Sequence, residues 1–196
     1  MKSWRSLKNK ETLKSGGKVI LGIDPGIARM GYGVVILQGN QMRAREYGTL
    51  TTEAGQPPEL RLAEMFEKVQ KVLKKVKPEA VAVEELFFSR NAKTAIAVGQ
   101  ARGVALLACG LLGLPVYEYR PMEVKQAIAG FGGADKEQIQ KMVKLLLGLA
   151  EVPKPDDTAD ALAIAITHAQ CSGTRLSEAV KRLSRTPVNG QTFLKR

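Results

Sequence analysis

Hydrophobic and polar positions in the first fifty residues follow a strand-like pattern. Residues 19–23 form a short apolar, β-branched run that is typical of a buried strand. Turn sequences at 24–26 and 39–40 separate this run from two further expected strands, at 33–37 and 42–50. These three segments predict a β-meander.

The rest of the chain alternates expected helices with single expected strands. Apolar positions from Leu60 to Val76 recur at helical spacing, and Pro78 ends that helix. Asp135 and Gln138 fit an N-cap and capping box for a later helix. The other elements are expected as strands at 80–83 and 115–119 and as helices at about 92–112, 121–129, 136–147 and 157–171. This order predicts an α/β domain with a mixed five-stranded sheet flanked by helices.

Length and composition fit one globular domain with two tails. The chain has 196 residues, of which 44% are hydrophobic and 25% charged, and this usage excludes wholesale disorder. We expect a basic extension at 1–17, a folded domain at 18–172 and a basic tail at 173–196.

The lack of targeting signals and of long apolar runs, together with the cysteine usage, favours a cytoplasmic protein with no membrane span. No apolar run approaches the ~18–20 residues that a membrane span needs. The basic N-terminal segment lacks the apolar core of a signal peptide. Cys109 and Cys171 lie in apolar helical sequence, so we expect two buried thiols in a reducing compartment.

The net charge of +11 favours a nucleic-acid partner, but it is concentrated at the two ends. Residues 1–18 and 173–196 each carry a net charge of +5, whereas residues 19–172 carry only +1. A nucleic-acid site on the domain itself must therefore be a local patch.

Four acidic residues stand out against their apolar surroundings. Asp24 and Glu84 each end an expected strand, and strand ends meet at one edge of an α/β sheet. Asp157 and Asp160 open an apolar helix and, three residues apart, share a face of it. Clustered carboxylates repel one another unless a cation neutralises them. Oxygen ligands suit Mg²⁺ or Mn²⁺, and two such ions about 3.5–4 Å apart serve phosphodiester cleavage.

Each acid also has a purely structural interpretation. Asp24 fits a common turn, Glu84 fits a solvated strand end, and Asp157 fits a helix N-cap. Asp160 is harder to explain in this way, because it lies within an Ala- and Ile-rich helix. The residue pattern alone leaves both interpretations open.

Four stretches together resemble a known family. They are ILGIDPG with GYGV (20–26 and 31–34), VEELF (83–87), GQARGV (99–104) and DTADALAIA (157–165). In order and spacing they resemble the RuvC family of crossover junction endodeoxyribonucleases, the Holliday junction resolvases. The resemblance implies an RNase H-like fold, a homodimer, and symmetrical metal-dependent nicking of four-way DNA junctions in recombination and repair.

The resemblance also implies roles for individual residues and partners. Asp24, Glu84, Asp157 and Asp160 become the catalytic acids that bind two Mg²⁺ ions, with Mn²⁺ as a substitute. Asp156 adjoins Asp157, which leaves open which of the two is the ligand. The branch-migration proteins RuvA and RuvB are the implied partners.

DNA contacts are expected from aromatic and basic residues. The resemblance makes Phe87 an aromatic wedge that stacks on a base at the junction, whereas core packing is the alternative for one of Phe87 and Phe88. A glycine loop at 130–133 that leads into a helix is a ready phosphate site. Candidate phosphate contacts are Arg90, Lys93 and Arg102 after the wedge, and Lys125 and Lys136 on either side of the loop.

Three alternative functions compete with a junction nuclease. An actin-like ATPase needs a second lobe that 196 residues do not supply. A non-catalytic DNA-binding module using the basic tails leaves the four acids unexplained. A YqgF-like RNase H-fold nuclease is the nearest alternative, and the Phe87-Phe88 pair and the long 92–112 segment favour the RuvC family over it. His168, on the last expected helix, is expected to be a core or edge residue and not a ligand.

Overall fold

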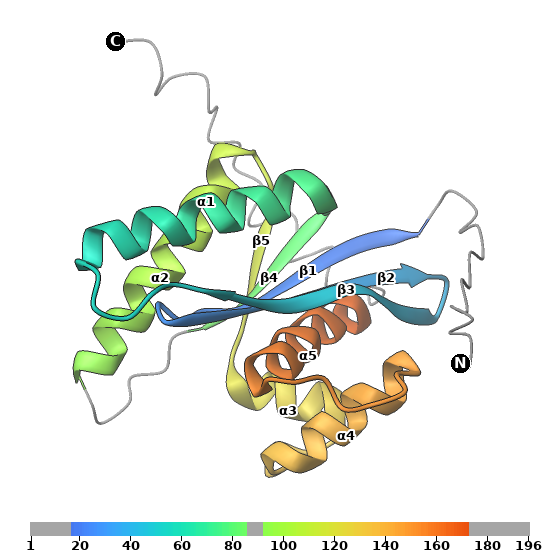
Figure 1. Ribbon diagram of the computed structural model, residues 1–196. Helices are drawn as coiled ribbons and strands as arrows, with labels where there is room; N and C mark the ends of the chain where they lie inside the picture. Colours follow the sequence, from blue (N-terminus) through green and yellow to red (C-terminus); the bar gives the residue numbers. More distant parts are fainter. Residues whose placement is uncertain (1–16, 86–91, 173–196) are drawn as a thin grey trace, which may run out of the picture.

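Five strands form one mixed sheet in the computed structural model, which describes residues 17–85 and 92–172 (Figure 1). The strands are β1 (Lys18–Asp24), β2 (Arg29–Gln38), β3 (Gln41–Thr51), β4 (Ala80–Glu84) and β5 (Val116–Tyr119). Their order across the sheet is β3-β2-β1-β4-β5. The predicted meander pairs antiparallel, and β4 and β5 continue from β1 in parallel. The order of elements matches the prediction, although β2 begins four residues earlier than expected.

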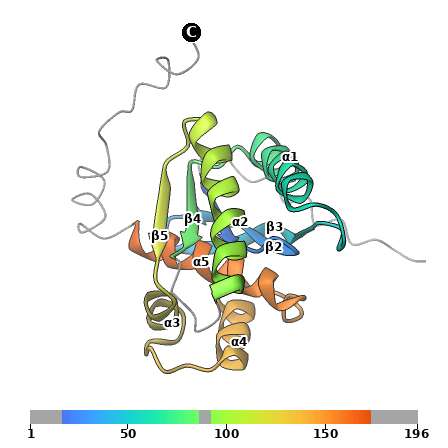
Figure 2. The same cartoon turned by 90° about the vertical axis from the view of Figure 1, so that its left-hand side faces the viewer.

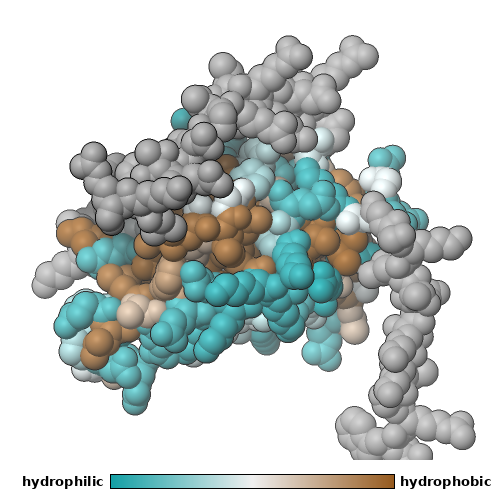
Figure 3. Space-filling model, turned by 90° about the horizontal axis from the view of Figure 1, so that it is seen from above, coloured by the Kyte–Doolittle hydropathy of each residue, from teal (hydrophilic) through white to brown (hydrophobic). Residues whose placement is uncertain are grey.

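Helices cover both faces of the sheet. They are α1 (Pro58–Val76), α2 (Ala92–Leu111), α3 (Pro121–Ala129), α4 (Lys136–Leu147) and α5 (Asp156–Cys171). Two views show α1 and α2 on one face and α5 against the other, with α3 and α4 packed outside α5 (Figures 1 and 2). The surface seen from above carries both hydrophilic and hydrophobic residues (Figure 3). None of the helices within the described ranges has the length and apolar character of a membrane span.

Local sequence signals fix the ends of α1 and α4. α1 starts at Pro58, and its C-cap Lys77 adopts a left-handed φ of 51°, with Pro78 next in the chain. The predicted capping box opens α4: the Gln138 amide donates to Asp135 Oδ1 at 2.8 Å, and the Asp135 amide donates to Gln138 Oε1 at 3.1 Å.

Alternating strand residues build two hydrophobic cores, one on each face of the sheet. On β1, Leu21 and Ile23 pack toward α1 and α2, whereas Ile20 packs toward α5. α5 is apolar around most of its surface, because every residue from Thr158 to Ala169 is buried except Asp160. This helix is therefore the centre of the second core.

The two cysteines differ in their environment. Cys109 is a buried free thiol, as predicted, and burial raises its pKa to about 11. Cys171, at the end of α5, is only partly buried, so the prediction of two buried thiols is wrong for this residue. Cys171 is the last residue of the helix and follows the exposed Gln170, so it lies past the buried run that ends at Ala169.

Candidate active site

Asp24 and Glu84 lie side by side at one edge of the sheet. Each is the last residue of its strand, β1 and β4. The two strands run parallel in a register that pairs Ile23 with Val83, so the next residue of each strand emerges at the same edge. Parallel neighbours thus bring together two carboxylates that are sixty residues apart in sequence.

Glycines on β1 and β2 allow α5 to lie directly on the sheet backbone. A Cβ atom added at Gly31, which pairs with Asp24, would lie 1.9 Å from the carbonyl oxygen of Asp157. A Cβ atom added at Gly22 would lie 2.0 Å from the carbonyl oxygen of Ala161. Because no side chain intervenes, the first turns of α5 reach the sheet edge where Asp24 ends β1.

This contact brings the acids of α5 to the acids of the sheet. Asp157 and Asp160 lie in the first two turns of α5 and are both partly exposed. The N-cap of the helix is Pro155, so the interpretation of Asp157 as a helix N-cap is wrong. Asp160 is the one residue that breaks the buried run of this helix.

The carboxylates influence one another strongly. The pKa of Asp24 is raised from 3.8 to about 8 by burial first, then by the negative charges of Glu84, Asp160 and Asp157. Burial, followed by the charge of Asp160, raises the pKa of Glu84. Burial also raises the pKa of Asp160. The predicted residues therefore form one electrostatic unit.

Two basic side chains contact the acids of α5. Lys136 Nζ, from the start of α4, lies 3.2 Å from Asp160 Oδ2 and 3.2 Å from Asp156 Oδ2. Arg29 Nε, from the first residue of β2, lies 3.4 Å from Asp157 Oδ2. The positive charge of Lys136 opposes the rise in the pKa values of Asp24, Glu84 and Asp160.

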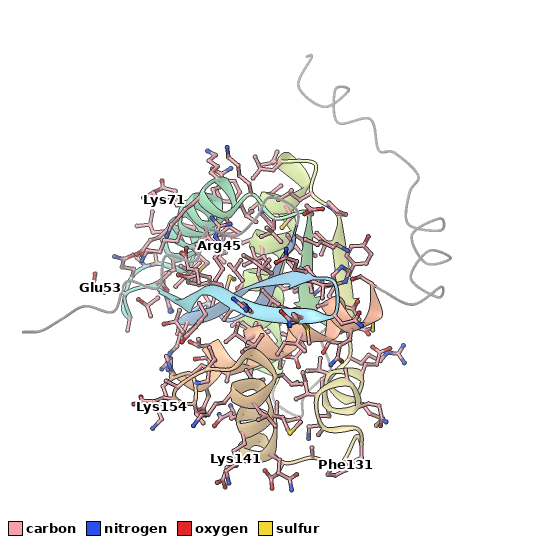
Figure 4. All side chains as sticks on the ribbon, turned by 90° about the vertical axis from the view of Figure 1, so that its right-hand side faces the viewer. Arg45, Glu53, Lys71, Phe131, Lys141 and Lys154 are labelled. Carbon is pink, nitrogen blue, oxygen red and sulfur yellow. The ribbon has the colours of Figure 1, made fainter. Side chains whose placement is uncertain are left out.

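A surface hollow of about 730 Å³ opens beside this cluster. Basic and acidic residues line it together with residues of the turn between β1 and β2. Lys154, which lies beside α4 and projects outward, stands at its rim (Figure 4). The lining residues are Gly26, Ile27, Ala28, Arg29, Ala97, Val98, Lys136, Lys154, Pro155, Asp156 and Asp157. Among the acids, Asp156 and Asp157 line the hollow, together with Lys136, which contacts Asp160.

The acids are gathered but not arranged as a finished metal site. Within residues 17–85 and 92–172, no three His, Cys, Asp or Glu side chains are placed so that they could hold a metal ion. The ammonium of Lys136 and the guanidinium of Arg29 instead provide positive charge beside Asp160 and Asp157. The raised pKa of Asp24 shows that the cluster still favours added positive charge, from a proton or from a cation.

Comparison with known proteins identifies the family. Residues 20–168 match the family of the crossover junction endodeoxyribonuclease RuvC. The chain belongs to the RuvC family. It is 59% identical to the RuvC of Brevibacillus brevis over 83% of this chain and 99% of that protein, and 57% identical to the RuvC of Chloroflexus aggregans over 79% and 94%. This membership sets aside the actin-like ATPase and YqgF-like alternatives.

Solved structures agree with this assignment. Thermus thermophilus RuvC in complex with a Holliday junction substrate has a TM-score of 0.76 and 46% identity, covering 79% of this chain and 94% of that one. The yeast mitochondrial Holliday junction resolvase Ydc2 has a TM-score of 0.58 at 14% identity, with 85% and 86% covered. At 14% identity, the yeast protein shows similarity of fold alone. The predicted RNase H-like fold is confirmed.

The predicted DNA contacts fall into three groups. Phe87 and Arg90 lie outside the described residues, as does the side chain of Lys93. Lys136 forms an ion pair with Asp160, whereas Lys125 is half-buried on α3. Arg102 was expected at a phosphate, but its guanidinium lies 2.5 Å from Glu118 Oε2 and links α2 to β5. That contact is structural, because Arg102 is largely buried.

Arg29 is the site residue that sequence reasoning missed. It follows a turn in an otherwise apolar stretch, and no pattern marks it as a partner of Asp157. His168 is a core residue as predicted: it is 2% exposed, and its Nδ1 lies 2.9 Å from the hydroxyl of Tyr119. Its ring also packs on Tyr117, at a centroid distance of 4.3 Å.

Proposed function

We propose that this chain is an endonuclease that resolves Holliday junctions by symmetrical metal-dependent nicks during recombination and repair. The observation that carries the proposal is the gathering of Asp24, Glu84, Asp157 and Asp160 at one sheet edge, in a member of the RuvC family. A structure of Thermus thermophilus RuvC, 46% identical to this chain, contains a Holliday junction substrate. Four-way junction DNA is therefore the proposed substrate.

The donor set of the cluster fits hard divalent cations. All four side chains offer carboxylate oxygens, and burial and repulsion raise the pKa of Asp24, which a bound cation would reverse. Asp24, Glu84, Asp157 and Asp160 would hold two Mg²⁺ ions, with Mn²⁺ as a substitute. When bound, such ions activate water and neutralise charge on the phosphodiester.

The basic residues of the site would bind and orient the DNA strand. Lys136 lies at the acid cluster and also lines the hollow, so its ammonium can contact a phosphate that enters there. Arg29, which also lines the hollow, would orient the carboxylate of Asp157 through their ion pair. Lys125, Arg90 and Lys93 are proposed phosphate contacts farther out, and Phe87 is the proposed base-stacking wedge.

A homodimer would place two such sites against the near-symmetric junction. Supporting it, α2 lies on the outside of the molecule and exposes Ile96, Leu107 and Leu111 (Figure 2). Gly103, which has open space at its Cβ position, shares this stripe. We further propose RuvA and RuvB as partners and a cytoplasmic location.

The test is cleavage of a labelled synthetic four-way junction by the full chain, with Mg²⁺ and with EDTA. We expect paired symmetrical nicks only with Mg²⁺ or Mn²⁺, and no cleavage of a linear duplex of the same sequence. Glu84→Gln and Asp160→Asn keep side-chain size but remove a negative ligand, so cleavage should fall on the order of 10³-fold while junction binding remains.

A matched control is Glu53→Gln, which removes an exposed carboxylate in the segment that follows β3 (Figure 4); its charge is not among those that raise the pKa of Asp24. This variant should cut as the unmodified chain does. Junction binding without cleavage in any divalent metal would instead support the non-catalytic DNA-binding module. Near-normal cleavage by Glu84→Gln or Asp160→Asn would exclude that residue as a ligand.

A further inference from the structure

The Asp156 carboxylate, on the first residue of α5, is bound to α4 through both of its oxygens. Gln140 Nε2 donates to Asp156 Oδ1 at 3.0 Å. Lys136 Nζ lies 3.2 Å from Asp156 Oδ2. Lys136 and Gln140 are one helical turn apart on α4, so the two contacts come from the same face of that helix. They fix the orientation of a carboxylate that is otherwise exposed.

Lys136 is shared between two unlike acids. Its second partner is Asp160, whose side chain is 33% exposed, whereas the side chain of Asp156 is 60% exposed. A divalent cation held by Asp160 would neutralise that carboxylate and repel the ammonium. Asp156 would then remain as the charged partner that keeps Lys136 beside the cluster.

We propose that Asp156 is a positioning residue for Lys136 and not a metal ligand. It holds the ammonium at the rim of the hollow, where the phosphate of the DNA strand would enter, and this inference rests on the proposed nuclease function. A lysine stem is flexible, and ordering it costs conformational entropy. A partner that orders it before DNA binds removes that cost from the reaction.

The surroundings of Asp156 separate it from the metal-binding acids. The negative charge of Asp157 contributes to the raised pKa of Asp24, whereas Asp156 acts only on the nearer Asp160, whose pKa it raises. Asp156 is also the most exposed of the three acids near the start of α5. The contacts of Asp156 are therefore with α4 and not with the acids at the sheet edge.

The first test measures single-turnover cleavage of a four-way junction at saturating Mg²⁺. Asp156→Asn keeps the oxygen that accepts from Gln140 but removes the charge that holds Lys136. We expect Asp156→Asn to slow cleavage about 10-fold. We expect Lys136→Ala to slow it on the order of 100-fold. Because Asp156 acts through Lys136, the double variant Asp156→Asn/Lys136→Ala should cut no more slowly than Lys136→Ala alone. Asp156→Glu keeps the negative charge, so it should retain most of the rate of the unmodified chain.

The second test measures Mn²⁺ binding to the DNA-free chain by calorimetry. We expect Asp156→Asn to bind Mn²⁺ within about two-fold of the unmodified chain, since it removes no ligand, and Asp160→Asn to bind it much more weakly. Junction affinity in EDTA should also stay within about two-fold for Asp156→Asn, because the lysine remains present and charged.

Glu137→Gln is the matched control. It removes a carboxylate that pairs with a lysine of the same helix, Lys141, at 2.7 Å on the outer surface (Figure 4). It should cut at the normal rate. Normal cleavage by Asp156→Asn, an additive double variant, or a clear loss of Mn²⁺ affinity would each overturn the inference. If the unmodified chain cuts no junction with any divalent metal, the proposed function itself fails, and that outcome is distinct from these three.

Discussion

Replacing Asp24 by Asn should stabilise the metal-free protein at neutral and alkaline pH. Asp24 ends β1 beside Glu84, and burial and neighbouring negative charges raise its pKa from 3.8 to about 8. An asparagine of the same size carries no charge that burial and these neighbours would oppose. The expected gain in stability comes from the same electrostatics that would favour a bound cation.

The sign follows from where the proton is held. The folded-state pKa lies above the unfolded one, so between about pH 4 and pH 8 the folded chain keeps a proton that the unfolded chain loses. The stability of the unmodified chain should therefore fall through this range and then level off. Each whole unit of pKa corresponds to about 1.4 kcal/mol. The full change gives an upper limit of about 6 kcal/mol, and partial hydration of the ionised group at the sheet edge reduces our expectation to ~3 kcal/mol.

The assay is thermal unfolding in EDTA across pH 4 to 9. At pH 4 the unmodified chain and Asp24→Asn should melt together, and by pH 8.5 the variant should melt roughly 6–12 °C higher. Adding Mg²⁺ should raise the melting temperature of the unmodified chain more than that of the variant. Glu53→Gln, on an exposed residue, should show no such pH-dependent gain. Equal melting temperatures of Asp24→Asn and the unmodified chain at pH 8.5 would refute the reasoning.

Three further variants test the packing, the dimer and the wedge. Gly31→Ala places a methyl group against the Asp157 carbonyl, so we expect a loss of about 1–3 kcal/mol in urea unfolding and a roughly 100-fold loss of cleavage. Leu107→Glu puts a charge on the outer stripe of α2, so light scattering should show a monomer of 21.3 kDa if the stripe is the dimer interface. Phe87→Ala should weaken junction binding by about 1–3 kcal/mol with little change in melting temperature, if it stacks on a base. A large drop in melting temperature with intact binding would instead assign Phe87 to the core.

Local patterns were sufficient to predict most of the fold. The apolar runs of β1 and β4, the helical spacing of α1 and the capping box of α4 are all encoded by neighbouring residues. The start of β2 was missed, because Arg29 is polar and lies directly after the turn. Propensity at such a position is weak, and pairing with Thr51 of β3 decides the outcome.

The acids were predictable, but their partners were not. Asp24 and Glu84 stand at strand ends, and Asp160 stands within an apolar helix, so each breaks a local pattern. The contacts of Arg29 with Asp157, and of Lys136 with Asp160, join residues more than twenty positions apart. Only the packing of α4 and α5 against each other and against the sheet determines such pairs, and no local signal encodes it.

The contact between α5 and the sheet joins stability to function in this fold. Gly22 pairs with Gly33 across β1 and β2, and Asp24 pairs with Gly31, so the glycines form a bare strip of backbone that leads to the first acid. α5 packs on this strip with an almost wholly buried helix, and the same contact holds Asp157 and Asp160 near Asp24. Repulsion among the acids opposes this arrangement, while burial of the apolar face of α5 favours it. The core that stabilises α5 therefore also holds the carboxylates together, and the site needs no separate scaffold.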